Sequence, residues 1–245
     1  MTPALLVFDS ATDRLAVALL ANGRIGFADE PGAERASARL LPVIDRLLGE
    51  SGLRRDEIGG IGFGRGPGAF TGLRAACTVA QGLALARRLP VCPIDTLAVV
   101  AEDARQRAQP SDGAAVDDVR VVQDARMGEI YAARWRYAEG RWHCLEAAAL
   151  MSPDAWNEAQ ACSPAPWVAG SALHVFGDRL RTGSARCDGL ARPGALALAA
   201  CMRQAWEAQD WVEVEAALPA YVRDKVAQTS VERAARHANR RGPDS

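Results

Sequence analysis

The chain has 245 residues, a net charge of −1 and 49% hydrophobic residues. This composition is ordinary for a globular protein with a large core, and it provides no global basic field for holding nucleic acid. The six cysteines are scattered without a CxxC pair, which indicates reduced thiols in the cytoplasm. No apolar stretch reaches the roughly 18 residues of a transmembrane helix, so we expect no membrane association.

In the first half of the chain, short apolar runs alternate with turns and with helically spaced leucines. Asn22–Gly23 predicts a tight hairpin turn, and the apolar positions between residues 40 and 48 follow helical spacing. In chain order we expect strands at 3–8, 14–20 and 24–29, a helix at 34–50, a strand at 58–63, a helix at 73–87, a strand at 90–94 and a helix at 96–107.

The polar stretch 108–118 is the best candidate linker, and beyond it the opening pattern recurs. An acid-bearing turn after the first strand, at Asp9 and again at Asp124, is followed each time by a hairpin, which predicts two related βββα halves facing one another. We therefore expect an N-terminal lobe at 1–107, a C-terminal lobe at 108–228 and a loose polar tail at 229–245. The second lobe should hold strands at 119–123, 129–137, 141–147 and 166–169, and helices at 153–161, 172–181 and 193–208.

The glycine-rich segment 64–72 is the most informative feature, because it joins a buried strand to a helix rich in small residues. Such a segment can present backbone N–H groups to a phosphate, or it can be only a tight turn. It lacks the lysine of a P-loop and matches a dinucleotide-binding pattern only loosely. The candidate loop residues are Gly64, Arg65, Gly66, Gly68, Thr71 and Gly72, with Asp9, Ser10 and Thr12 in the first turn and Asp124 and Arg126 in the second.

Asp9 and Asp124 occupy equivalent turns, where an aspartate can hold Mg²⁺ through water or can cap the turn through its own backbone. We favour the capping role. Ser171 after Gly170 adds bulk where related ATP-binding folds place a second glycine, which weakens the case for a nucleotide. The three histidines are too dispersed for a metal motif, and no nucleophile elbow is present, so we expect no metal and no catalytic residue.

Five short segments carry the most specific patterns of the chain: residues 8–12, 64–74, 80–84, 124–131 and 219–223. Together they resemble the TsaB family, also called YeaZ, in order over about residues 3–226. The resemblance implies an α/β, two-lobed acetate-kinase/Hsp70/actin-like fold with a ribonuclease H-like duplication, in which helices flank mixed sheets. It also implies a part in forming N6-threonylcarbamoyladenosine beside the anticodon of tRNA.

The resemblance implies a non-catalytic subunit that pairs with the catalytic relative TsaD. Thr96 and Val100 stand where TsaD carries two metal-binding histidines four residues apart. The ATPase TsaE would join the pair, and TsaC would supply threonylcarbamoyl-adenylate. This chain would contact tRNA mainly as part of the complex. No tightly bound cofactor is implied; a weak nucleotide site between the lobes, and a homodimer of the isolated chain, stay open.

The family pairs through its first two helices, here about 34–50 and 71–87. Some apolar residues of these helices must face the chain's own core. Gly68→Val should disturb the start of the second helix and so the pairing. The rival interpretations are a self-sufficient ATP-dependent phosphotransferase of the same fold and, more weakly, a protease. The interface candidates are Leu40, Leu41, Ile44, Leu47, Leu48, Leu73, Ala76, Ala80 and Leu83.

Overall fold

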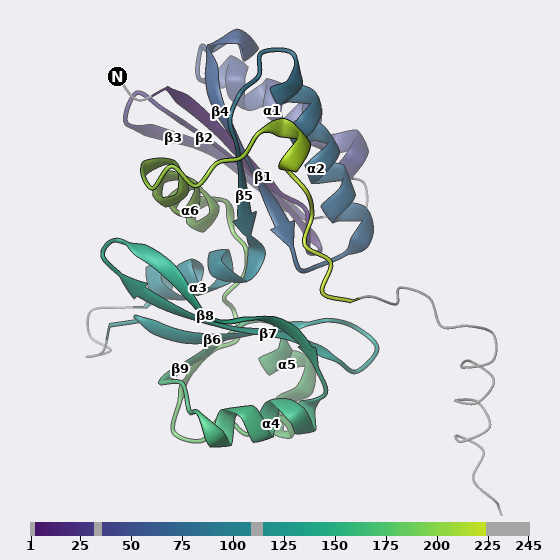
Figure 1. The fold of residues 1–245 in the computed structure, drawn as a ribbon, viewed down its shortest axis with the longest axis vertical. Helices are drawn as coiled ribbons and strands as arrows, with labels where there is room; N and C mark the ends of the chain where they lie inside the picture. The colour runs from purple at the N-terminus through teal and green to yellow at the C-terminus, as the bar shows by residue number, and fades with distance from the viewer. Residues whose placement is uncertain (1–2, 32–35, 109–114, 224–245) are drawn as a thin grey trace, which may run out of the picture.

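The structure is a computed structural model that describes residues 3–31, 36–108 and 115–223. It contains two five-stranded mixed sheets with helices between and outside them (Figure 1). Within the described ranges, no helix is long and apolar enough to span a bilayer. The predicted tail at 229–245 and most of the predicted linker lie outside the described residues.

The first sheet has the strand order β3-β2-β1-β4-β5. Strands β1, β2 and β3 are antiparallel neighbours, whereas β4 and β5 run parallel to β1. Asn22 and Gly23 both adopt positive φ in the turn between β2 and β3, as the sequence predicts. The strands are β1 (Ala4–Asp9), β2 (Arg14–Ala21), β3 (Arg24–Pro31), β4 (Ile58–Gly66) and β5 (Val91–Asp95).

The second sheet repeats this topology. Its order is β10-β9-β6-β7-β8, so three antiparallel strands are again followed by two parallel ones. The predicted duplication is therefore confirmed. The strands are β6 (Asp118–Asp124), β7 (Ile130–Ala138), β8 (Arg141–Met151), β9 (Trp167–Ala169) and β10 (Arg186–Asp188).

The helices complete five layers (Figure 1). Helices α1 and α2 cover the outer face of the first sheet, α6 and α3 lie between the sheets, and α4 and α5 cover the far face of the second sheet. The central strands of each sheet are thereby buried on both faces, as their continuous apolar runs require. The helices are α1 (Ala36–Glu50), α2 (Phe70–Leu85), α3 (Thr96–Arg107), α4 (Pro153–Cys162), α5 (Ala172–Phe176) and α6 (Ala195–Glu207).

The two middle helices cross between the lobes. Helix α3 follows the last strand of the first sheet but packs on β6, β7 and β9 of the second. Helix α6 follows the last strand of the second sheet but packs on β1, β2 and β5 of the first. The lobes proposed at 1–107 and 108–228 therefore separate the strands of the two sheets but share their helices.

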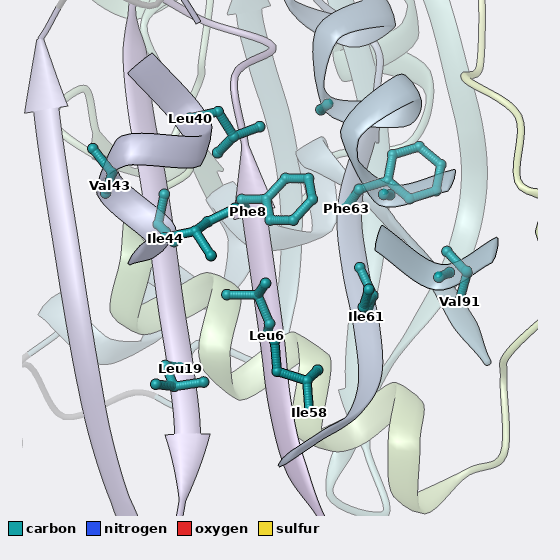
Figure 2. Close-up of a cluster of buried hydrophobic side chains, with 14 of the residues drawn as sticks. Leu6, Phe8, Leu19, Leu40, Val43, Ile44, Ile58, Ile61, Phe63 and Val91 are labelled. Atoms are coloured by element: carbon teal, nitrogen blue, oxygen red, sulfur yellow. The ribbon is translucent and has the colours of Figure 1, made fainter. Parts of the chain in front are cut away.

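Side chains of β1 point alternately into two different core clusters. Leu6 and Phe8 join the cluster beneath α1 and α2 (Figure 2). Leu5 and Val7 join the cluster beneath α6. All four side chains are at most 2% exposed. Because successive side chains point to opposite faces of a strand, a continuous apolar run is what a central strand covered on both faces needs.

Several predicted bounds differ from the structure, and one strand was not predicted. Strands β4 and β8, for example, continue to Gly66 and Met151 instead of ending at 63 and 147. The helix predicted at 172–181 ends at Phe176, because the next residue, Gly177, adopts φ +51°. A 3₁₀ turn, Gly177–Arg179, follows the helix. Helix α2 begins at Phe70, three residues earlier than predicted, because the loop closes directly onto its first turn. Strand β10 was not predicted, since its three residues are not enriched in strand-forming types.

Candidate functional site: the glycine-rich loop and its helices

The glycine-rich segment is pressed against the turn that follows β1. A Cβ atom on Gly72 would lie 1.8 Å from the carbonyl oxygen of Ser10, and one on Gly68 would lie 2.2 Å from that of Ala11. Real Cβ atoms do not come this close to backbone oxygen, so only glycine fits at either position. The glycines therefore allow two backbone segments to touch.

Hydrogen bonds join these two segments. The hydroxyl of Ser10 donates to the carbonyl of Gly72 (2.9 Å), and the N–H of Ala69 donates to the carbonyl of Ala11 (2.7 Å). The N–H of Gly66, at φ +108°, donates to the hydroxyl of Thr96 (3.2 Å). Because these hydroxyl and N–H groups donate to other groups of the chain, the geometry favours the tight turn over a phosphate-binding loop.

Asp9 lies beneath this loop and is only 2% exposed. One carboxylate oxygen accepts the N–H of Ala11 (2.6 Å), and the other accepts the hydroxyl of Thr96 (2.7 Å). Burial raises the pKa of the Asp9 carboxyl, although both hydrogen bonds act to lower it. The bond to Ala11 is the turn-capping contact that we favoured for this residue, and the second carboxylate oxygen is bonded to Thr96.

Asp124 caps the equivalent turn of the second lobe. Its carboxylate accepts the N–H of Arg126 (2.9 Å) and lies 3.2 Å from the guanidinium of the same residue. The N–H of Asp124 donates to the hydroxyl of Ser171, whose own N–H donates to the side chain of Gln123. Among the described residues, no hydrogen bond or ion pair joins Asp9 to Asp124, so the two acids serve separate turns.

Three further loop candidates lie at the edge of this arrangement. Thr12 accepts the N–H of Arg14 (3.3 Å), and Thr71 is exposed on the first turn of α2. Arg65 is exposed and lies 3.9 Å from the carboxylate of Asp95, the residue that caps α3. Burial raises the pKa of Asp95 to about 6, although the Arg65 charge opposes this shift.

A small cavity of about 190 Å³ separates the loop from the second lobe. Ligand pockets of proteins usually hold about 300–1,000 Å³, so this space is small for a nucleotide. No group of three or more metal-binding side chains occurs within the described ranges. The cavity is lined among others by Phe70, Leu73, Met127, Tyr131 and Tyr221.

Most of the proposed interface residues turn out to lie inside the chain's own core, which corrects our expectation for them. Figure 2 shows Leu40 and Ile44 of α1 in one cluster with Phe8 of β1. These positions are buried because they form the apolar stripe of each helix, and this stripe packs on the sheet. The enclosed candidates, all at most 3% exposed, are Leu40, Ile44, Leu47, Leu48, Leu73, Ala76 and Ala80.

Other positions on the same helices remain accessible. Leu41 is 38% exposed, Leu83 is partly buried, and Leu85 at the end of α2 is 62% exposed. Gly82 is exposed, and a Cβ placed on it would meet no atom within 4 Å. A partner that packs on α1 and α2 would therefore contact this outer face and not the buried stripe.

Comparison with known proteins identifies the family. Over 227 residues, 91% of this chain and 96% of the relative, the sequence is 33% identical to the tRNA threonylcarbamoyladenosine biosynthesis protein TsaB of Escherichia coli strain K12. The chain belongs to the TsaB family. A model of the TsaD family, described as tRNA N6-adenosine threonylcarbamoyltransferase, also matches residues 21–164.

Solved structures agree with this assignment to the TsaB family. A crystal structure of an uncharacterized Pseudomonas aeruginosa protein with similarity to peptidase YeaZ has a TM-score of 0.80 and 34% identity, covering 91% of this chain and all of that one. A structure of YeaZ from Pseudomonas aeruginosa has a TM-score of 0.76 and 32% identity, covering 90% of this chain and all of that one. The expected two-lobed α/β fold is confirmed.

Two features of this TsaB-family chain gain meaning from its geometry. Thr96 and Val100, the positions where the resemblance implies histidines in TsaD, are both fully buried on α3, and the hydroxyl of Thr96 donates to Asp9. Sequence reasoning quoted the segment 219–223 only as part of the resemblance and missed its packing against the glycine-rich loop. Its Pro-Ala-Tyr-Val-Arg pattern was the only signal available.

Proposed function

We propose that this chain acts in tRNA threonylcarbamoyladenosine biosynthesis, as a scaffold subunit that pairs with TsaD and supports threonylcarbamoyl transfer to the adenosine beside the anticodon. The observation that carries the proposal is the match to a TsaB protein over 96% of that protein's length. Function depends on particular sites and not on the fold alone. A match that spans both lobes includes the sites of both, so it supports a shared role better than a match to one lobe would.

The absence of catalysis by the chain alone is part of the proposal. Asp9 is the acid that a self-sufficient phosphotransferase would use to hold Mg²⁺. Its burial, its raised pKa and its two hydrogen bonds support a structural role instead. Thr96 and Val100 offer no imidazole for a catalytic metal, which supports a subunit that depends on TsaD for chemistry.

The partner surface is proposed to be the outer face of α1 and α2. Two helices packed side by side present a broad accessible face, and the small residues on α2 allow another helix to approach closely. A second copy of the chain could use the same face when TsaD is absent. TsaE and TsaC, contact with tRNA through the complex, and a cytoplasmic location complete the proposal. The exposed or partly buried residues of this face include Leu41, Asp45, Ala75, Thr78, Gly82 and Leu83.

The test is threonylcarbamoyl transfer to tRNA in a reconstituted system of TsaC, TsaD and TsaE, with and without this chain. Transfer that requires the chain supports the proposal. Full transfer without it would contradict the scaffold role. ATP turnover by the chain alone, abolished by Asp9→Ala, would favour the phosphotransferase.

A pair of variants tests the surface separately. Gly82→Arg places a long charged side chain on the outer face of α2, where the fold has room for it. Ala161→Arg makes a comparable change on exposed α4, on the far side of the second sheet. We expect Gly82→Arg to weaken TsaD binding at least tenfold, because a large charged side chain at this position would keep the two surfaces apart. The Ala161→Arg chain should bind TsaD normally. Equal binding by both variants would mean that TsaD uses another face.

A further inference from the structure

The last described segment of the chain, residues 217–223, runs from the first lobe to the second. Figure 1 shows it as the yellow-green end of the ribbon, which passes beside α2 toward the second sheet. In the described part of the chain, the lobes are joined covalently before α3 and before α6. This segment, here called the strap, adds a third crossing between the lobes.

The strap begins with a firm attachment to the first lobe. Ala217 is fully buried in the core beneath α1 and α2. Its carbonyl accepts the side-chain amide of Gln81 (2.9 Å) and the thiol of Cys77 (3.2 Å), both on α2. Further along, the N–H of Ala220 donates to the carbonyl of Arg65 in the glycine-rich loop (2.7 Å).

Tyr221 stacks on the beginning of α2. Its ring lies 5.2 Å from that of Phe70, and its hydroxyl accepts the Nε–H of Arg74 (3.2 Å). The guanidinium of Arg74 in turn lies over the Phe70 ring at 3.8 Å. This cation and aromatic stack fixes the direction in which the strap leaves the first lobe.

The next two residues contact the second lobe. Val222 packs on the core cluster formed by α3 and the second sheet. The guanidinium of Arg223 donates to the carbonyl of Ala125 (2.9 Å) and pairs with the carboxylate of Glu129 (2.8 Å), so it holds both sides of the turn between β6 and β7. The Arg223 side chain is only 15% exposed, which reduces the screening of this charged contact by solvent.

We propose that the strap is an interlobe clamp, which holds the second lobe at a fixed angle to α2 and the glycine-rich loop. Opening the lobes about the two covalent crossings would pull Val222 from its core and break both contacts of Arg223. The strap also lines the small cavity between the lobes through residues 220–223, so the same opening would be needed to enlarge that space. The strap thus makes the junction between the two lobes rigid, where the covalent crossings alone would form a hinge.

The clamp is tested by measuring the distance between the lobes in the isolated full-length chain. Spin labels are placed on exposed Cys162 of α4 and on Glu50→Cys of α1, while the other two exposed thiols are removed by Cys144→Ser and Cys187→Ser. Double electron–electron resonance then reports the interlobe distance distribution. The remaining cysteines are buried and should not react with the label.

We expect a narrow distribution in this background and a broader one, shifted to longer distance, in the clamp variant Tyr221→Ser/Val222→Ser/Arg223→Ser. Arg203→Ser, at an exposed position of α6, is the control and should leave the distribution narrow. A clamp variant that folds with an unchanged distribution would overturn the proposal. This measurement needs no partner, so its outcome is independent of the function proposed above.

Arg223→Ser alone provides a second measurement if the triple variant does not fold. The N–H groups of Ala125 and Glu129 are bonded within the turn that Arg223 holds. Loss of its two charged contacts should speed their hydrogen exchange on the order of tenfold, while amides of the first sheet stay protected. Unchanged exchange at Ala125 and Glu129 in a folded Arg223→Ser chain would overturn the clamp as well.

Discussion

Two glycines of the same helix should respond in opposite directions to the same substitution. Both Gly72 and Gly82 lie in α2, but an alanine Cβ at residue 72 would meet the Ser10 carbonyl oxygen at 1.8 Å, whereas one at residue 82 would meet nothing within 4 Å. The Ser10 oxygen belongs to the backbone and cannot rotate away. Gly72→Ala therefore has to move β1's turn or the first turn of α2.

The magnitudes follow from three effects. Overpacking of a close contact costs about 1–3 kcal/mol, and a weakened buried hydrogen bond between Ser10 and Gly72 costs about 1 kcal/mol more. The higher helix propensity of alanine offsets about 1 kcal/mol. We expect Gly72→Ala to lower the free energy of unfolding by roughly 1–3 kcal/mol, and Gly82→Ala to raise it by about 0.5–1 kcal/mol.

Urea unfolding of the two variants and the wild type, followed by far-UV circular dichroism, measures both values. The comparison is internally controlled, because helix, residue type and added atom are the same. If Gly72→Ala were as stable as the wild type, the tight contact between the loop and the first turn would not exist as described. A loss of stability in Gly82→Ala would contradict the open outer face of α2.

Two further predictions concern the buried polar groups near the loop. Thr96→Val leaves the Asp9 carboxyl and the Gly66 N–H without their shared partner, so we expect a loss of roughly 2–4 kcal/mol in the same unfolding assay; a loss below about 0.5 kcal/mol would show that these groups find other partners. Because burial raises the folded-state pKa of Asp95 from 3.8 to about 6, the folded chain retains a proton that the unfolded chain loses, and stability falls as pH rises between these values. Asp95→Asn keeps the helix cap but cannot ionise, so it should match the wild type near pH 4 and exceed its stability by up to roughly 3 kcal/mol near pH 7.5; parallel pH profiles of the two chains would refute this assignment.

The element order and the duplication were accessible from the sequence because they rest on local patterns. Apolar runs, the Asn22–Gly23 turn and the acid-bearing turns at Asp9 and Asp124 all act over a few residues. Helix α3 was predicted with its observed bounds, and the structure shows that Asp95 caps its start by accepting the N–H of Leu97. Strand β10 has no such pattern and forms only because β9 offers it a parallel edge.

Which face of a helix meets a partner could not be obtained in the same way. An apolar position such as Leu40 or Leu47 has the same spacing whether it covers the chain's own sheet or another subunit. Only the folded sheet shows that both are buried. Among the loop candidates, those near the turn after β1 meet there, whereas Asp124 and Arg126 form a separate turn of the second lobe. The bond between Asp9 and Thr96 joins residues 87 positions apart, so no local sequence pattern predicts it.

The crossing of α3 and α6 between the sheets has a consequence for synthesis of the chain. Strands β1 and β2 emerge first from the ribosome, but the helix that covers their inner face, α6, ends at Glu207. Until then, Leu5, Val7 and Leu20 lack most of the side chains that cover them on that face. One face of the first sheet therefore lacks its native helical cover until nearly the whole chain has been translated, which leaves apolar side chains open to aggregation or chaperone binding for most of that time.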